Sequence, residues 1–343
     1  MYSLFLEGYQ VLCTGEFSGD INFYHLTDSK VLFQPLRHHT DRVNSFETLH
    51  INNVEYLASA SADKTVIIWD LSTRKCFLEL PHVSVVNTLA SVDIDEKEYL
   101  ICGCEDGSII LWYISCVEGL ATHSYFYLTD EKEAKKKISF NDKINGVDEE
   151  GPGFGIYTFA IIKPTLNVYL ATAINKRKPD LPSSEFVKDE SLNYLIMIWD
   201  LETKKESFRL SDRSGYLTAL KEITNDGKEY LASSHKGGTI IIWNLSTRKS
   251  LYKLEDSKGD FINLTTLVIN KKQYIASLHN RTAFIANHCI LIWDVSTQEC
   301  EFVLDTEHSS KDNGSLNAMT TIIMNGVEYL VSGVSDEMVY VWV

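Results

Sequence analysis

Residues 56–70 read YLASASADKTVIIWD, and residues 230–244 read YLASSHKGGTIIIWN. In both stretches a Tyr-Leu pair opens the segment, and a Trp follows the Tyr by thirteen positions. Self-similarity at a fixed spacing is the sequence signature of a repeat architecture. The segment therefore predicts further copies along the chain.

Every tryptophan of the chain ends an apolar, β-branched run of this kind, at Trp69, Trp112, Trp199, Trp243, Trp293 and Trp342. A Tyr-Leu or Tyr-Ile anchor precedes each one, at Tyr56, Tyr99, Tyr169, Tyr230, Tyr274 and Tyr329. A seventh copy starts at Val11 and carries Tyr24 in place of the Trp. Seven units therefore cover nearly the entire chain.

Each unit contains the signals of four short strands. A run such as VNSFETLHI lies upstream of the anchor, and Asn52-Asn53 between the two suits a tight primed hairpin turn. After the Trp, a polar turn such as DLSTRK leads into a fourth run, CFLEL. Four antiparallel strands repeated seven times predict an all-β fold, a single seven-bladed β-propeller of four-stranded blades that spans residues 1–343.

The Trp-Asp pairs at Trp69-Asp70, Trp199-Asp200 and Trp293-Asp294 make the chain resemble the WD40-repeat family. The resemblance covers about nine-tenths of the chain. It implies that the repeated His, Ser, Asp and Trp residues are joined by hydrogen bonds inside each blade. In the second unit the residues that match this network are His39, Ser59, Asp63 and Trp69.

The third unit keeps His82, Asp106 and Trp112 but has Cys102 where the network expects Ser, so a weaker network is expected there. A structural role is also expected for Asp336 in the last unit and for the remaining tryptophans. The competing interpretation makes these His and Asp residues catalytic or metal-binding. Their recurrence at a blade-scale spacing favours the structural role, because a repeat distributes them around a ring.

The starts of the first strands offer a candidate partner-binding surface, since in the WD40 family this position faces one mouth of the central channel. Asn recurs there although Asn is depleted in strands, and neighbouring residues are of types enriched at interaction hot spots. Either these Asn side chains order water and pair across the axis, or they grip the backbone of a peptide. The candidate residues are Arg42, Asn44, Asn87, Glu105, Tyr157, Tyr216, Phe261, Asn263 and Asn317.

Three insertions interrupt the repeat, at about residues 129–154, 175–192 and 280–288. In the WD40 family the connections that carry them open on this same mouth, and function concentrates in such loops. The insertions therefore favour the same surface.

The two ends of the repeat raise the question of how the ring closes. YSLFL at residues 2–6 precedes Val11 as the end of the first run precedes other anchors, which places it in the first blade. The sequence after Trp342 holds one residue, so the last blade is expected to lack its outer strand. Residues 338–343, MVYVWV, would then be an apolar edge open to strand addition. The alternative is that YSLFL pairs with the last blade.

Composition bounds the partners. The net charge of −15 opposes nucleic-acid binding, where Lys and Arg supply most of the affinity, and favours a basic partner. No apolar stretch is long enough to cross a membrane. Seven cysteines with no CxxC pair indicate reduced thiols, hence a cytoplasmic protein, with the nucleus as an alternative.

The sequence thus predicts a non-catalytic scaffold that docks a protein or peptide and needs no cofactor or metal. The alternative is a recognition or sensor subunit of a larger assembly, such as a ubiquitin ligase, a signalling complex or a transport complex. An enzyme is the third possibility, but the inner columns offer Asn, Thr, Tyr and Phe rather than paired carboxylates.

Overall fold

The computed structural model describes residues 1–6, 8–25, 30–117, 120–128, 154–163, 168–176, 194–212, 214–225, 227–256, 259–270, 272–281, 289–305, 316–324, 327–334 and 339–342. The predicted insertions at about 129–154, 175–192 and 280–288 lie almost entirely outside these residues. Within the described residues there is no helix long and apolar enough to span a membrane.

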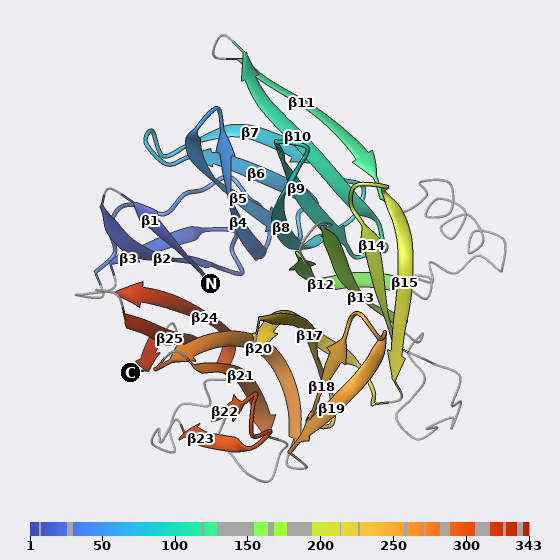
Figure 1. The fold of residues 1–343 in the computed structure, drawn as a ribbon. Helices are drawn as coiled ribbons and strands as arrows, with labels where there is room; N and C mark the ends of the chain where they lie inside the picture. The colour runs from blue at the N-terminus through green and yellow to red at the C-terminus, as the bar shows by residue number, and fades with distance from the viewer. Residues whose placement is uncertain are drawn as a thin grey trace, which may run out of the picture.

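Seven antiparallel sheets stand around a common axis, each following the previous one along the chain (Figure 1). This is the seven-bladed propeller that the repeat predicts. Blades 2 to 6 each have four strands. Blade 2 consists of β4 (Val43–Ile51), β5 (Val54–Ser61), β6 (Thr65–Asp70) and β7 (Lys75–Pro81), and blade 3 consists of β8 (Val86–Ile94), β9 (Lys97–Cys104), β10 (Ile109–Val117) and β11 (Leu120–Tyr127). Blade 4 consists of β12 (Phe154–Ile162), β13 (Tyr169–Lys176), β14 (Tyr194–Asp200) and β15 (Lys205–Asp212), blade 5 of β16 (Leu217–Asn225), β17 (Lys228–His235), β18 (Thr239–Asn244) and β19 (Lys249–Glu255), and blade 6 of β20 (Gly259–Ile269), β21 (Lys272–Arg281), β22 (Cys289–Asp294) and β23 (Cys300–Asp305).

Blades 1 and 7 have three strands each in the described residues: β1 (Tyr2–Leu6), β2 (Tyr9–Gly15) and β3 (Ile21–His25); β24 (Leu316–Met324), β25 (Val327–Val334) and β26 (Val339–Trp342). In blade 1 the segment 31–36 covers the outer edge through two isolated bridges, Tyr24 with Val31 and Ile21 with Leu36. Blade 7 ends at β26, which confirms the prediction that its outer strand is missing.

The residues 2–6 belong to blade 1, where β1 pairs with β2. Leu4 faces Val11 just as Leu49 faces Tyr56, so the register follows the sequence alignment. The alternative, in which this segment pairs with the last blade, is therefore wrong. Asn52 and Asn53 both have positive φ angles, 51° and 63°, as a primed hairpin turn requires.

One register is common to all seven blades. The residue that follows each anchor pairs with the Trp of the third strand, or with Tyr24 in blade 1. The pairs are Leu12 with Tyr24, Leu57 with Trp69, Leu100 with Trp112, Leu170 with Trp199, Leu231 with Trp243, Ile275 with Trp293 and Leu330 with Trp342. The thirteen-residue interval is thus the length of a hairpin formed by the second and third strands.

The core of the described residues consists of apolar clusters between neighbouring sheets. Alternate residues of each strand point to opposite faces, and each face packs on the next blade or on the previous one. The third strand of blade 2 shows both, because Ile68 packs towards blade 3 and Trp69 towards blade 1. Between blades 7 and 1 the buried cluster is limited to Leu12, Ile322 and Val331.

Two glycines at the same repeat position show how the interface between blades 3 and 4 differs from the seam between blades 7 and 1. Gly103 and Gly333 both lie four residues after their anchor Tyr. A Cβ on Gly103 would lie 2.5 Å from Cζ of Phe159 and 2.7 Å from Cγ2 of Ile156 in blade 4. For a Cβ on Gly333 the three nearest heavy atoms all belong to the Met1 side chain, with Sδ at 2.7 Å.

We expect Gly103→Ala to lower the free energy of unfolding by about 1–3 kcal/mol, because an extra methyl group in a packed interface forces its neighbours apart. Gly333→Ala is the matched control and should cost much less, since the end of a flexible Met side chain can move aside. Denaturant midpoints of the two variants provide the measurement. Equal losses would contradict the assigned packing at the seam between blades 7 and 1.

Candidate functional site

Each tryptophan indole donates a hydrogen bond from Nε1, and in five blades the acceptor is a hydroxyl of the second strand. The pairs are Trp69 with Ser59 (2.7 Å), Trp199 with Thr172 (3.1 Å), Trp243 with Ser233 (2.8 Å), Trp293 with Ser277 (2.8 Å) and Trp342 with Ser332 (2.9 Å). Every one of these hydroxyl residues lies three positions after its anchor Tyr. That spacing was visible in the sequence, although only Ser59 was singled out from it.

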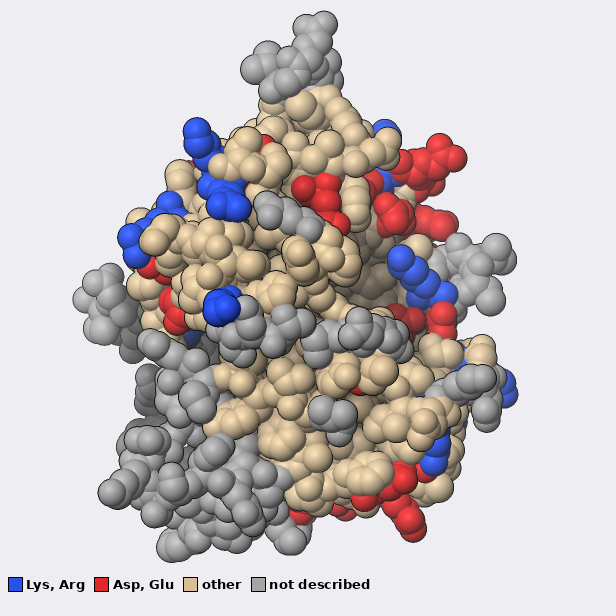
Figure 2. All heavy atoms as spheres, turned by 90° about the vertical axis from the view of Figure 1, so that its left-hand side faces the viewer, with Lys and Arg blue, Asp and Glu red and all other residues tan. Residues whose placement is uncertain are grey.

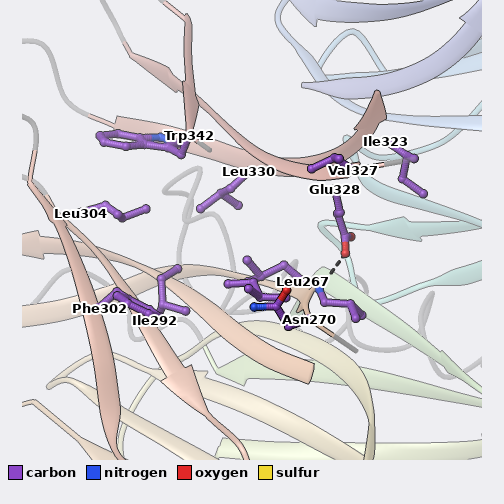
Figure 3. A pocket seen from close by; sticks show the side chains of 12 residues that line it. Leu267, Asn270, Ile292, Phe302, Leu304, Ile323, Val327, Glu328, Leu330 and Trp342 are labelled. Carbon is purple, nitrogen blue, oxygen red and sulfur yellow. Dashed lines mark hydrogen bonds between the residues drawn. The ribbon is translucent and has the colours of Figure 1, made fainter. Parts of the chain in front are cut away.

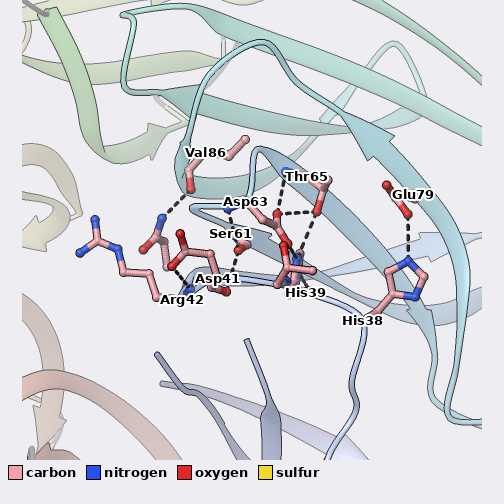
Figure 4. Close-up of polar contacts among 12 residues, drawn as sticks. His38, His39, Asp41, Arg42, Ser61, Asp63, Thr65, Glu79 and Val86 are labelled. Atoms are coloured by element: carbon pink, nitrogen blue, oxygen red, sulfur yellow. Dashed lines mark hydrogen bonds and ion pairs between the residues drawn. The ribbon is translucent and has the colours of Figure 1, made fainter. Parts of the chain in front are cut away.

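The most complete polar network lies in blade 2 (Figure 4). His39 Nδ1 lies 2.9 Å from Oδ2 of Asp63, and His39 Nε2 lies 2.8 Å from Oγ of Ser59. Ser59 therefore accepts from the Trp69 indole and donates to the neutral imidazole, which in turn donates from Nδ1 to Asp63. The structure thus joins His39, Ser59, Asp63 and Trp69 in one hydrogen-bonded chain.

The protonation states in this chain follow from burial. Burial lowers the pKa of His39 despite the opposing effect of Asp63, so the ring stays neutral. Burial acts to raise the pKa of Asp63, but hydrogen bonds from Thr65, Thr40 and His39 hold it below the usual value. The two groups serve packing and orientation, and neither faces an open site.

In blade 3 the tryptophan indole donates to an acceptor other than a hydroxyl. Because Cys102 occupies the place of the Ser, the Trp112 indole donates directly to Nε2 of His82 at 3.1 Å. Nδ1 of His82 donates to the Leu80 carbonyl oxygen at 3.0 Å, and burial lowers the pKa of His82 to about 4. Asp106 accepts hydrogen bonds from the backbone N–H and hydroxyl of Ser108, so it holds the turn and does not contact His82.

Blade 5 draws its histidine from a different position. His235, two residues after Ser233 on the same strand, places Nε2 3.0 Å from the Ser233 hydroxyl. Its Nδ1 donates to the Gly215 carbonyl oxygen at 3.1 Å. The sequence alignment missed His235, because it searched for histidines in the connections between blades. Its position five residues after the anchor, which His279 shares in blade 6, was the available signal.

At the channel mouth, two of the candidate asparagines link neighbouring blades. Nδ2 of Asn44 donates to the carbonyl oxygen of Val86 at 2.9 Å, and Nδ2 of Asn87 donates to that of Ile156 at 3.2 Å. Each Asn thus binds the start of the next blade's first strand. The structure thus gives these two side chains a role in joining neighbouring blades that the sequence did not predict.

The other candidates at this mouth differ in exposure. Arg42 is exposed, Tyr157 is 40% exposed, and Glu105 and Tyr216 are half-buried. The Lys236 ammonium lies 5.5 Å from the centroid of the Tyr216 ring. The exposed part of the mouth therefore combines one guanidinium with two tyrosines. The side chain of Asn317 and the residue Asp336 lie outside the described residues.

Phe261 requires a correction, because it is fully buried. Its ring packs against His279 and Trp293, with centroid distances of 5.2 and 6.3 Å. Strand β20 has a bulge between Phe261 and Asn263, so Phe261 occupies the position of Val43 and Ile262 that of Asn44. The sequence alignment was wrong by one residue in this blade, and Phe261 cannot contact a partner.

Two residues that the sequence reasoning missed bear on the site. Phe17 is 81% exposed in the turn between β2 and β3, and its neighbour Glu16 accepts a hydrogen bond from the backbone N–H of Val43 at this mouth. The sequence signal for Phe17 was an aromatic residue in a turn where the other units have polar residues. The second residue is Glu47, which lies inside the ring.

Glu47 of blade 2 connects three blades. Its Oε1 accepts from the hydroxyl groups of Tyr2 in blade 1 at 3.1 Å and of Ser91 in blade 3 at 3.3 Å. Burial raises its pKa to about 6, although these hydrogen bonds act in the opposite direction. The ring therefore holds a carboxylate outside the two columns that the sequence aligned, and this carboxylate joins blades. Among the described residues, no group of three or more His, Cys, Asp or Glu side chains could hold a metal ion.

Comparison with known protein families agrees with this geometry. Residues 30–70, which contain His39, Ser59, Asp63 and Trp69, match the family model described as "WD domain, G-beta repeat". The protein is a seven-bladed β-propeller that contains a WD40 repeat. WD40 propellers are generally protein-interaction scaffolds and are typically non-catalytic. A search of the curated proteins found no match to the chain.

Ser59 of the WD40 propeller allows a direct test of its polar network. We expect Ser59→Ala to lower the free energy of unfolding by about 2–4 kcal/mol, because it removes a partner from both the Trp69 indole and the His39 ring. Ser332→Ala in blade 7 is the matched control and should cost about 1 kcal/mol, since only the half-buried Trp342 loses its acceptor. Chemical denaturation checks both, and a smaller loss for Ser59→Ala than for the control would refute the assigned chain.

The raised pKa of Glu47 predicts that the free energy of unfolding depends on pH. A carboxyl group whose pKa is raised from 4.5 to about 6 on folding stabilises the fold when protonated, and this stability is lost as the pH rises through 6. Replacement Glu47→Gln should therefore raise the free energy of unfolding at pH 8 by about 2 kcal/mol relative to its effect at pH 4.5. Comparing the variant with the wild type at each pH cancels all other titrating groups. A pH-independent difference would show that Glu47 has an ordinary pKa.

Proposed function

We propose that the protein is a non-catalytic scaffold that docks a protein or peptide partner at the mouth where the first strands begin. The observation that carries this proposal is the set of exposed Phe17, Arg42 and Tyr157 side chains on this mouth. Aromatic residues and Arg dominate interaction hot spots, because they bury much area with little loss of side-chain freedom.

The support beneath these side chains is rigid. Asn44 and Asn87 fasten the starts of adjacent first strands, and Glu47 fastens three blades further down the ring. A partner that binds here finds its contacts already in place, and such preorganisation lowers the entropic cost of association. Shape and polar contacts on a rigid surface are therefore the proposed mechanism.

The proposed partner surface is basic. Acidic side chains lie near the mouth, at Asp41, Glu105, Asp106 and Asp256 in the connections between strands and at Asp260 near the start of β20. Together with the net charge of −15, they favour approach of a positively charged segment. We place the protein in the cytoplasm, which is supported by free thiols throughout, including the buried Cys13, Cys102, Cys104 and Cys289.

Exchange of Phe17, Arg42 and Tyr157 together for Ala should reduce partner capture at least about tenfold without a loss of thermal stability, because all three side chains are exposed. Quantitative affinity purification with the wild-type and variant proteins measures this difference. Val54→Ala is the control, since Val54 is 51% exposed at the other end of blade 2. Unchanged capture of every partner by the triple variant would rule out this mouth.

A further inference from the structure

The outward strand of blade 7 leaves an apolar row uncovered. Val341, the residue before Trp342, is 40% exposed. The equivalent residues of the four-stranded blades are at most 3% exposed: Ile68, Leu111, Ile198, Ile242 and Ile292. In those blades an outer strand covers the position, and in blade 7 β26 is the last strand that the structure describes.

A pocket of about 770 Å³ lies beside β26, between blades 6 and 7 (Figure 3). Its walls include Leu330 and Trp342 from blade 7 and Phe302 and Leu304 from β23 of blade 6. Glu328 turns its carboxylate away to the backbone N–H of Val268 at 2.7 Å, which leaves the lining mostly apolar. On the side of the ring where blades 1 and 7 meet, the described surface below the grey atoms is mostly uncharged (Figure 2).

The repeat shows what fills this place elsewhere. At the interfaces between other blades, the residue two positions after the Trp packs into a buried apolar cluster. That cluster contains the residues that correspond by repeat position to Leu304, Leu330 and Trp342. These residues are aliphatic in every case: Leu71, Ile114, Leu201, Leu245 and Val295. The described part of blade 7 ends at Trp342 and supplies no such side chain.

The outer strand that follows has a pattern of its own in three of the five four-stranded blades. In blades 4, 5 and 6 an aromatic residue follows the buried aliphatic one by seven positions and a Leu follows it by nine, as in Leu245, Tyr252 and Leu254. The aromatic residue pairs with the residue before the Trp, and the Leu faces the next blade. In blade 7 the equivalent partners would be Val341 and Val339.

A basic residue completes the pattern. Three positions after the buried aliphatic residue, Arg74, Lys204 and Arg248 each lie over an aromatic ring of the preceding blade, at 4.3, 3.8 and 4.6 Å from the ring centroid. The equivalent aromatic ring in blade 6, the blade that precedes blade 7, is that of Phe302, which is 46% exposed. Cation–π contact of this kind contributes about 0.5–1 kcal/mol at exposed sites.

We infer that a partner protein donates an extended segment that completes blade 7. The segment places an aliphatic side chain in the pocket, a Lys or Arg three residues later over Phe302, and an aromatic residue and a Leu at positions seven and nine over Val341 and Val339. Its backbone pairs antiparallel with β26. This surface lies on the outer side of the ring, so it is independent of the mouth proposed above.

The protein's own sequence supplies a probe. A labelled peptide with the sequence of residues 244–255, NLSTRKSLYKLE, carries all four features and should bind the wild-type protein saturably with 1:1 stoichiometry, measured by fluorescence anisotropy. Hydrogen exchange at residues 339–342 should slow when it binds. Replacement of the peptide's Leu245, Tyr252 and Leu254 by Ser should weaken binding at least about tenfold.

The protein variant Val341→Asp should weaken binding of the same peptide at least about tenfold, because a carboxylate would be buried beneath the added strand. Leu251→Asp is the matched control, since Leu251 is a 53% exposed residue on the outer strand of blade 5, and it should leave binding unchanged.

Three results would overturn the inference. The first is no binding, or equal binding to the wild type and to Val341→Asp. The second is slow exchange at residues 339–342 in the monomer without peptide, because the edge would then already be covered. The third is a dimer in sedimentation experiments that Val341→Asp dissociates, because a second copy would then be the occupant.

Discussion

The indole N–H of each tryptophan lies at the boundary of two sheets, where an unpaired donor would be costly. The second strand meets this requirement with a hydroxyl three residues after its anchor, which holds the third strand in register and presents the ring to the preceding blade. Blade 3 shows that the constraint is an acceptor rather than a serine. There Cys102 offers no hydroxyl, and the indole of Trp112 donates to Nε2 of His82 instead.

The rest of the ring follows from the two faces of each sheet. A blade in mid-ring buries both faces against neighbours, so its stability depends on theirs, as in any stacked repeat. The seam between blades 7 and 1 is the thinnest, because β1 begins near the middle of a normal first strand. The Ser3 hydroxyl donates to the Thr321 carbonyl oxygen at 3.1 Å, and Met1 packs beside Gly333. Single side chains therefore make the contacts between these two blades that the first half of a full-length first strand makes between other blades.

Both proposed interaction surfaces arise where the repeat is interrupted. At the mouth, Phe17, Arg42 and Tyr157 lie in or beside turns and bulges, where their side chains are exposed. At blade 7 the described strands stop at Trp342, and the pocket is lined by residues whose counterparts in the other blades pack around an aliphatic side chain. The repeat thereby defines the chemistry of what can bind there, because five internal examples show how such a side chain is seated.

Sequence spacing was sufficient for the number of blades, the strand order and the three-stranded last blade, because the same anchor and Trp recur in every complete unit and fix the register even where an insertion lengthens the turn between them. Further polar positions, such as Ser233 and Ser332, could have been read from the same spacing. The site was predicted less well. Apolar residues alternate along a strand, so an alignment that slips by one at a bulge exchanges buried for exposed positions, as happened with Phe261 and Asn263.

The sequence alone therefore determined the architecture of this protein, since strand length, turn chemistry and the Trp interval are local properties. Only the tertiary structure decided which side chains remain available to a partner. Burial depends on the surrounding strands rather than on the residue itself: Ile292 and Val341 hold the same repeat position, yet Ile292 is covered by the outer strand β23 and Val341 is 40% exposed on the last described strand.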